Sequence, residues 1–398
     1  MKLSSIVLLS AMWIAGLAPG ILPAQTAPEP GYQVPSADQA LLSGNRDLRT
    51  LPCNVSAVSP QMGFDLRFHT GYMIRLPLEA LTGTGNQLHV LLRVSPLPPS
   101  GRSFLLRDLI SVPAVSEGAR GQTEIPGRFA VGPGRYRVDW LLRDRAGRVC
   151  SAHWTIEARL RSAYRNVLLP MPPDTAGPAP DDAFREVPPV SRDRQHPLHL
   201  KLLVNFSAGD NTVLDHNKVQ TITSILRAVA RQSPFGRFTV VAFSTDQQRV
   251  FYRQPESSRI DFPALGRAFK ELRFGTVDLA QIRHRDSAAT FLARVLAQDL
   301  GPQQPSPDAI LIISPKVPLA GDPKPAGAGR PPCPVFYMDY NPDPARYPWP
   351  GAMGTALKMY GAMQYTISAP RDLGVAMGKM LERLRTSGPT TAEAFTGH

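Results

Sequence analysis

Residues 198–210 read LHLKLLVNFSAGD, and this stretch decides the fold of the C-terminal half. The nearly continuous apolar run at 198–204 predicts a strand that is buried on both faces. A segment with apolar residues at helical offsets follows it, at Val219, Ile222, Ile225, Leu226 and Val229. A buried strand followed by an amphipathic helix is the repeating unit of a parallel α/β sheet.

The alternation of strands and helices continues toward the C-terminus. Apolar runs predict strands at 238–243, 250–252, 309–313 and 335–338. Helical spacing predicts helices at 262–272, 291–300 and 373–384, the last with Ser368 as its candidate N-cap. The pattern predicts a doubly wound α/β domain over residues 198–386, with its natural site at the carboxyl ends of the strands.

Residues 51–160 have a different pattern, of short alternating strands separated by turn residues. The clearest strands are LHVLLRV at 88–94, RYRVDWLL at 135–142 and VCSAHWTI at 149–156. A Gly-containing turn joins the last two as a hairpin. Several closely spaced strands without a helical stripe predict an all-β sandwich of immunoglobulin-like or fibronectin-like type.

The remaining segments predict an exported protein with flexible connections. Residues 1–25 have Lys2, a short apolar run and small residues near Ala24, which is typical of a secretory signal peptide cleaved near that point. No later stretch is long and apolar enough to predict a transmembrane anchor, so we expect a periplasmic or secreted protein. Composition predicts a flexible arm at 26–50, a Pro-rich linker at 161–197 and a disordered tail at 387–398.

The three cysteines fit this compartment. Cys53 and Cys150 bracket the predicted β-domain, and in an oxidising space we expect them to form a disulfide. Closing a loop of this length would stabilise the domain by about 4–5 kcal/mol. Cys333 is expected to stay a free, buried thiol.

The net charge of +12 does not indicate a nucleic-acid-binding protein. The excess is spread along the chain, no run of five basic residues occurs, and only 8 of the 44 cationic residues are Lys. We therefore expect no nucleic-acid partner.

Five segments of the C-terminal half have the order and spacing of a known kind of domain. They include LLVNFSAG at 202–209, RFTVVAFSTDQQRVFYRQ at 237–254 and RFGT at 273–276. The others are AILIISPKV at 309–317 and the closing strand and helix at 360–384. Together these segments resemble a von Willebrand factor A-type domain, in the form of the A-related module of secreted bacterial proteins.

The resemblance implies a Mg²⁺ or Mn²⁺ site built on the pattern Asp-x-Ser-x-Ser, a later Thr and a final Asp. Here Asn205 stands at the Asp position, Ser207 and Gly209 at the two Ser positions, Thr276 at the Thr position and Pro315 at the final Asp position. Both carboxylates are missing, and a hard divalent cation needs anionic oxygen ligands. We therefore predict no resident metal or cofactor, although the nearby Asp210 could compensate in part.

The resemblance and the degenerate site favour a non-enzymatic protein that recognises an unknown protein partner in the cell envelope or outside the cell. The candidate surface is the face that would carry the metal: Asn205, Ser207, Gly209, Asp210, Thr276, Ser314 and Lys316. On this interpretation Lys316 and Gly209 lie on exposed loops, and the face receives an acidic side chain directly. A Pro-rich excursion with Asp339, Tyr340, Tyr347 and Trp349 could anchor a partner or form a lid over the domain's apolar end.

A secreted serine hydrolase is the alternative. The run NFSAG at 205–209 is one residue away from the nucleophile elbow G-x-S-x-G, with Ser207 as the nucleophile. Asn205 stands where that turn needs a small residue. Of the later histidines His216, His284 and His398, only His284 is expected in a loop that could approach the top of a sheet, and no suitable acid-bearing strand end precedes it. Solvated positions are therefore favoured over a triad.

Overall fold

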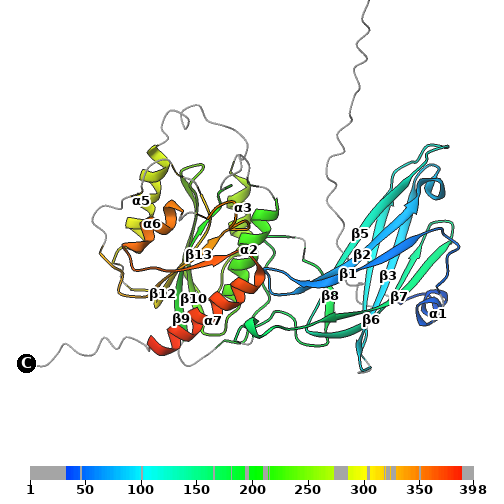
Figure 1. Ribbon diagram of the computed structural model, residues 1–398, viewed down its shortest axis with the longest axis horizontal. Helices are drawn as coiled ribbons and strands as arrows, with labels where there is room; N and C mark the ends of the chain where they lie inside the picture. The colour runs from blue at the N-terminus through cyan, green and yellow to red at the C-terminus, as the bar shows by residue number, and fades with distance from the viewer. Residues whose placement is uncertain are drawn as a thin grey trace, which may run out of the picture.

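The computed structural model describes residues 33–387 except 45–46, 100–101, 165, 181, 193–196, 209–213, 215, 273–285, 303–304, 318, 320–322, 324–328 and 349–350. The predicted signal peptide at 1–25 lies outside the described residues, as does the predicted tail apart from its first residue. The chain forms two domains, an N-terminal β domain and a C-terminal α/β domain (Figure 1).

The N-terminal domain consists of two antiparallel four-stranded sheets. Their strands are β1 (Asn54–Met62), β2 (Phe68–Pro77), β3 (Asn86–Leu97), β4 (Phe104–Val112), β5 (Gln122–Val131), β6 (Gly134–Arg143), β7 (Val149–Ala158) and β8 (Ala176–Pro178). One sheet has the order β1-β2-β5-β8 and the other β4-β3-β6-β7. The strands predicted at 88–94, 135–142 and 149–156 lie within β3, β6 and β7.

The two sheets share one hydrophobic core. Alternate residues of each strand face it, as in β2, where Tyr72, Ile74 and Leu76 are fully buried. Trp140 of β6 lies opposite with no exposed surface, and its ring centroid is 5.5 Å from that of Tyr72. Trp140 is therefore a core residue, as its place in an alternating strand predicts.

Residues predicted as a flexible arm carry a docked helix, which corrects that prediction for the described part of 26–50. Helix α1 (Ser36–Ser43) lies against the outer face of the second sheet, where Leu42 packs with buried residues of β3 and β6. The guanidinium of Arg93 donates to the Leu42 carbonyl at 2.7 Å, and Arg143 forms an ion pair with Asp38. An apolar stripe and two arginines on the sheet hold the helix in place.

The predicted linker at 161–197 is also partly folded. Residues 176–178 form β8, which pairs with β5 at the edge of the first sheet. Tyr164, Val167 and Ala183 are buried in the core of the C-terminal domain. The prolines prevent regular structure here, but the apolar residues between them pack on both domains.

The C-terminal domain is built on a six-stranded mixed sheet. Its strands are β9 (Leu198–Asn205), β10 (Phe235–Ser244), β11 (Arg249–Ser257), β12 (Ala309–Pro315), β13 (Val335–Tyr340) and β14 (Met363–Ile367), in the order β11-β10-β9-β12-β13-β14. All neighbouring pairs are parallel except the edge strand β11, which is antiparallel to β10. This confirms an α/β domain built on a mixed sheet, as the alternation of strands and helices predicts.

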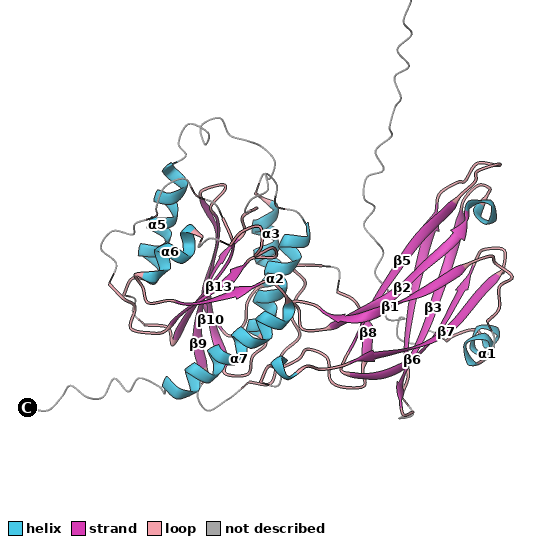
Figure 2. Ribbon diagram, in the orientation of Figure 1, coloured by secondary structure: helices cyan, strands magenta, loops and turns pink. Residues whose placement is uncertain are grey.

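Helices cover both faces of this sheet. The helices are α2 (His216–Ala230), α3 (Phe262–Lys270), α5 (Asp286–Leu300), α6 (Ala352–Lys358) and α7 (Pro370–Ser387). The core on one face contains residues of α2, α3 and α7, and the core on the other contains residues of α5 and α6 (Figure 2). Helix α7 begins at Pro370, so Ser368, the predicted N-cap, lies one residue outside the cap position.

The hairpin of β1 and β2 reaches from the first domain to the second (Figure 1). At its tip Leu66 is 1% exposed and belongs to the core on the α2 and α7 face. The ring of Phe64 meets that of Tyr340 edge to face, with centroids 5.6 Å apart. The hairpin tip therefore joins the two domains through apolar contacts.

Candidate functional site

The carboxyl end of β9 carries a group of uncharged polar side chains, which we call the polar cluster: Asn205, Ser207, Thr245 and Ser314. Asn205 ends β9, Thr245 directly follows β10, and Ser314 is the penultimate residue of β12. Because β10, β9 and β12 are parallel neighbours, their ends meet at one edge of the sheet. The four side chains lie on the side of the sheet that α5 and α6 cover, next to the apolar core on that side.

Hydrogen bonds close the polar cluster on itself. The Ser207 hydroxyl donates to Asn205 Oδ1 at 2.6 Å, and the backbone N–H of Thr245 donates to Ser207 Oγ at 2.9 Å. The Asn205 amide donates to Ser314 Oγ at 3.0 Å and lies 3.5 Å from Thr245 Oγ1. Ser314 donates onward to the Pro315 carbonyl at 2.8 Å, and the two oxygens of Ser207 and Thr245 lie 2.8 Å apart.

One assignment of hydrogens satisfies all of these contacts. If the Ser207 proton points to Asn205 Oδ1, the Thr245 proton points to Ser207 Oγ, and both amide hydrogens of Asn205 have hydroxyl acceptors. Each of the four residues is at most 2% exposed. A cation could enter only by breaking these bonds, and it would find neutral oxygens instead of the carboxylates that a hard cation needs.

A buried acid extends the polar region toward β13 and β14. Asp339 is 1% exposed, and its carboxylate accepts the Tyr337 hydroxyl at 3.2 Å and the Gln364 amide at 3.0 Å. The ammonium group of Lys316 lies 3.9 Å away. Burial raises the pKa of Asp339, while Lys316 and the two hydrogen bonds oppose that rise.

Lys316 and Asn341 hold the loop that follows β13. The ammonium group of Lys316 and the amide of Asn341 both donate to the carbonyl of Tyr347, each at 2.9 Å. Residues 342–346, before this anchor point, are exposed. The guanidinium of Arg346 stacks on the Tyr347 ring at 5.2 Å from its centroid. Two buried donors thus fix an exposed loop at the carboxyl edge of the sheet.

Several residues of the predicted binding face are not exposed in the structure. The hydroxyls of Ser207 and Ser314 point into the protein, and the Lys316 side chain is 12% exposed, so none of the three is the exposed group that the sequence predicts. Gly209, Asp210 and Thr276 lie outside the described residues. Tyr340 is a buried contact of Phe64, and Trp349 is also outside the described residues.

Sequence reasoning missed Thr245, which follows β10 and bonds to both Asn205 and Ser207. The signal for it is a hydroxyl residue directly after the strand that neighbours β9. It also treated Asp339 as part of a loop, whereas this residue lies inside β13. An acidic residue in an otherwise apolar and aromatic strand is a signal of a buried polar contact.

Ser207 is not arranged as a nucleophile in the described part of the chain. Its hydroxyl donates to an amide oxygen, where a nucleophile would donate to a base. His216 lies at the start of α2, is exposed, and has its Nε2 3.3 Å from the Gln220 amide. His284 and His398 lie outside the described residues.

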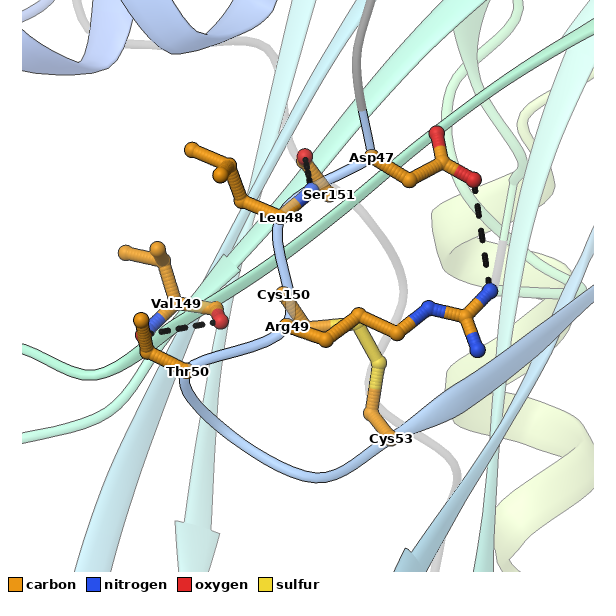
Figure 3. The surroundings of a disulfide bond; sticks show 8 residues. All are labelled: Asp47, Leu48, Arg49, Thr50, Cys53, Val149, Cys150 and Ser151. Carbon is orange, nitrogen blue, oxygen red and sulfur yellow. Dashed lines mark hydrogen bonds and ion pairs between the residues drawn. A yellow bond between two sulfur atoms is a disulfide. The ribbon is translucent and has the colours of Figure 1, made fainter.

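The predicted disulfide is confirmed. Cys53 and Cys150 are bonded, with Cα atoms 6.3 Å apart, and Cys333 is free. Figure 3 shows how the strand-like segment before Cys53 lies along β7. There the backbone N–H of Leu48 donates to Ser151 Oγ at 2.9 Å and that of Val149 donates to Thr50 Oγ1 at 2.7 Å. The bridge and these bonds tie the N-terminal segment to the last strand of the second sheet.

The described residues form neither a membrane-spanning helix nor a cluster of metal ligands. None of the helices there is long and apolar enough to cross a membrane. No group of three or more His, Cys, Asp or Glu side chains in the described ranges is placed to hold a metal ion.

Comparison with known proteins does not assign a family. No family model and no curated protein matches the chain. The chain has local similarity to the alkylpurine DNA glycosylase AlkC of Pseudomonas fluorescens, at 15% identity over 27% of this chain and 30% of that one, with a TM-score of 0.17. It is similar to a β-glucosidase of Listeria innocua at 9% identity over 28% of this chain and 17% of that one, with a TM-score of 0.17.

A third solved structure, β-glucuronidase 2 of Bacteroides uniformis, is 7% identical over 73% of this chain and 36% of that one, with a TM-score of 0.19. The chain thus spans about a third or less of the length of these three structures. TM-scores this low carry no argument about fold or activity.

Proposed function

We propose that this chain is an extracytoplasmic recognition protein whose C-terminal domain is von Willebrand factor A-related and binds a protein partner without a divalent cation. The disulfide between Cys53 and Cys150 supports an oxidising compartment, because such bonds rarely persist in a reducing cytosol. The proposal has three parts, which concern the α/β domain, the β domain and the site.

Strand order supports the resemblance of the C-terminal domain. The order β11-β10-β9-β12-β13-β14 places the first strand of the domain at the centre and a single antiparallel strand at one edge. The antiparallel hairpin of β10 and β11 is the segment that carries part of the resemblance in sequence. The site expected from the resemblance then falls at the carboxyl end of β9, where the polar cluster lies.

Strand order also supports a fibronectin-like β domain. Strands β1, β2, β5 and β8 form one sheet and β4, β3, β6 and β7 the other. Apart from the short strand β8, this is the division of a seven-stranded sandwich in which one strand has moved to the other sheet. Tyr136 lies near the start of β6, and its hydroxyl donates to the Gly132 carbonyl at 2.8 Å. This contact has the form of a tyrosine corner, a recurring feature of such sandwiches.

The observation that carries metal-free recognition is the closed bonding of Asn205. Both N–H donors and the oxygen of its amide have partners inside the polar cluster. In a metal-binding relative, the side chain at this position would bind the ion instead. The same bonds fix the ends of β9, β10 and β12 relative to one another. The edge of the sheet is therefore ordered by hydrogen bonds alone.

The exposed loop at 342–346 is the surface we assign to the partner. It lies at the carboxyl edge, the position at which α/β domains bind ligands. Arg346 is exposed and is held by stacking on Tyr347, so it presents a preordered cation. A guanidinium in this setting favours an acidic side chain of the partner.

Site-specific crosslinking tests this assignment. A photoreactive residue in place of the exposed Ala345 should capture a partner from a cell-envelope extract, with equal yield in EDTA and in Mg²⁺. Arg346→Glu should reduce the yield severalfold, whereas Arg159→Glu, a change at an exposed arginine of the β domain, should not. Loss of capture in EDTA, or full capture by Arg346→Glu, would contradict the proposal.

A further inference from the structure

Arginines gather where the β1–β2 hairpin tip meets the C-terminal end of α2. We call this group the arginine cluster: Arg67, Arg185, Arg192, Arg227 and Arg231. Arg67 comes from the hairpin, Arg185 and Arg192 from the segment that connects the domains, and Arg227 and Arg231 from the last turn of α2 and the residue after it. The cluster therefore lies at the junction of the two domains.

Two of these arginines have well-defined contacts. Arg192 donates to the Ala230 carbonyl at 3.1 Å and to the Phe235 carbonyl, which satisfies acceptors at the C-terminal end of α2. Arg227 donates to the carbonyl of Asp182 at 3.2 Å and to that of Arg185, and its guanidinium lies 5.0 Å from the centroid of the Phe262 ring. These bonds hold the connecting segment against α2 and leave other donors unused.

The unused donors are buried. The Nε–H groups of Arg227 and Arg231 have almost no exposed surface and no hydrogen-bond partner among the described residues. The Nε–H group of Arg67 is equally buried and lies 4.0 Å from Asp65 Oδ2, with which it forms an ion pair. Buried donors in proteins are nearly always paired, and an unpaired donor on a charged group is especially costly. Two such donors at one junction, beside the charge of Arg67, indicate an acceptor that the described residues do not supply.

The charges at the junction are also unbalanced. Asp65 and Asp182 are the acids that act on Arg227, against repulsion from Arg67 and Arg185. Burial first, and then this repulsion, lowers the pKa of Arg227 to about 10. Asp65 neutralises part of this charge within the hairpin: its Oδ1 is 2.8 Å from His69 Nε2 and accepts the Arg67 backbone N–H at 3.2 Å, and its Oδ2 lies 4.0 Å from Arg67 Nε.

We propose that the arginine cluster binds a tetrahedral oxyanion, either free phosphate or the phosphomonoester group of a larger molecule. Guanidinium groups bind such oxyanions through paired N–H donors, and Nε–H is one member of each pair. Arginines that approach from a hairpin and from a helix suit a tetrahedral acceptor better than a planar carboxylate. The bound anion would link Arg67 of the first domain to Arg227 and Arg231 of the second.

Thermal unfolding with inorganic phosphate, at an ionic strength held constant with NaCl, tests the proposal. Above its Kd, phosphate should raise the melting temperature in proportion to the logarithm of its concentration, by roughly 2 °C for each tenfold increase. Arg231→Gln should abolish this rise. Without phosphate the same variant should melt at or above the wild-type temperature, because it removes a repelling charge and one unpaired donor.

Arg159→Gln is the matched control, since this side chain is 81% exposed and lies in the β domain, and it should keep the full response to phosphate. Vesicles with and without phosphatidic acid separate the two sources. A response to phosphate identifies a free-anion site, and binding only to phosphatidic acid vesicles identifies a phosphomonoester site. No response to either probe overturns the proposal, as does a phosphate response that survives Arg231→Gln or a lower melting temperature of that variant in phosphate-free buffer.

Discussion

The ring of Phe64 meets the ring of Tyr340 edge to face, with centroids 5.6 Å apart, so the tip of a hairpin in the β domain covers the end of a strand in the α/β domain. Leu66, two residues farther along the hairpin, is buried in the same core. The connection between the domains is therefore a packed contact in addition to a covalent link. Its strength decides whether the two domains unfold together.

Leu66→Asp should uncouple the domains. The side chain is 1% exposed, and placing an unpaired carboxylate there is strongly unfavourable. Calorimetry should show one unfolding transition for the wild type and two for the variant. Val58→Asp, at an exposed position of the same hairpin, should keep the single transition. A single transition in Leu66→Asp would show that the hairpin contact does not couple the domains.

Ser207→Ala should destabilise the protein by about 1–3 kcal/mol. The change leaves the backbone N–H of Thr245 with only the weaker 3.3 Å contact to Asn205 Oδ1 and removes the donor to that oxygen. Urea unfolding of the variant against the wild type measures the difference. An unchanged free energy of unfolding would mean that the closed bonding of the polar cluster contributes nothing.

A fluorophosphonate probe should not label Ser207, because its hydroxyl is buried and donates to Asn205 Oδ1. Labelling followed by intact-mass analysis, with Ser207→Ala as the control, checks this. A label that disappears in Ser207→Ala would establish the serine hydrolase and refute the non-enzymatic account.

Lys316→Met should loosen the loop at 342–346 without unfolding the domain. Methionine keeps most of the apolar length of the side chain but loses the donor to the Tyr347 carbonyl. Hydrogen exchange should therefore become faster at 342–346 and stay unchanged in β9. Equal exchange in the two proteins would show that Asn341 alone anchors the loop.

Cys333 should react slowly with iodoacetamide in the native protein. Burial raises the pKa of this thiol to about 11, so at pH 8 only about one molecule in a thousand is the reactive thiolate. The rate should rise about tenfold for each pH unit up to the pKa, and denaturation at pH 8 should accelerate it strongly. Rapid native labelling at pH 8 would contradict the raised pKa of this half-buried thiol.

The α/β core was predictable because its signal is local. Apolar runs such as 309–313 and helical stripes such as 219–229 lie within single elements, and both are present in the structure. The docked helix at 36–43 and the folded part of 161–197 were not predictable in this way. These two segments have a composition that is typical of flexible chain, and they are folded because they contact strands that are distant in the sequence.

The sequence predicts where the site lies in the sheet, but not that its side chains are buried and bonded to one another. The loss of carboxylates at Asn205 and Pro315 is visible in the sequence. Ser207 turns inward to Thr245, which directly follows β10, and Ser314 turns inward to Asn205 at the end of β9. Spacing along the chain does not show which strands are neighbours. The burial of Lys316 likewise depends on the loop that ends at Tyr347.

The melting temperature in millimolar Mn²⁺ or Mg²⁺, compared with EDTA, tests metal-free recognition most directly. A cation that binds only the native state raises stability by about 2.7 kcal/mol at a hundredfold excess over its Kd, whereas a polar cluster closed around Asn205 gives no such gain. We predict the same melting temperature in all three conditions. A rise of several degrees that Ser207→Ala abolishes would show that the site holds a metal and would contradict the account.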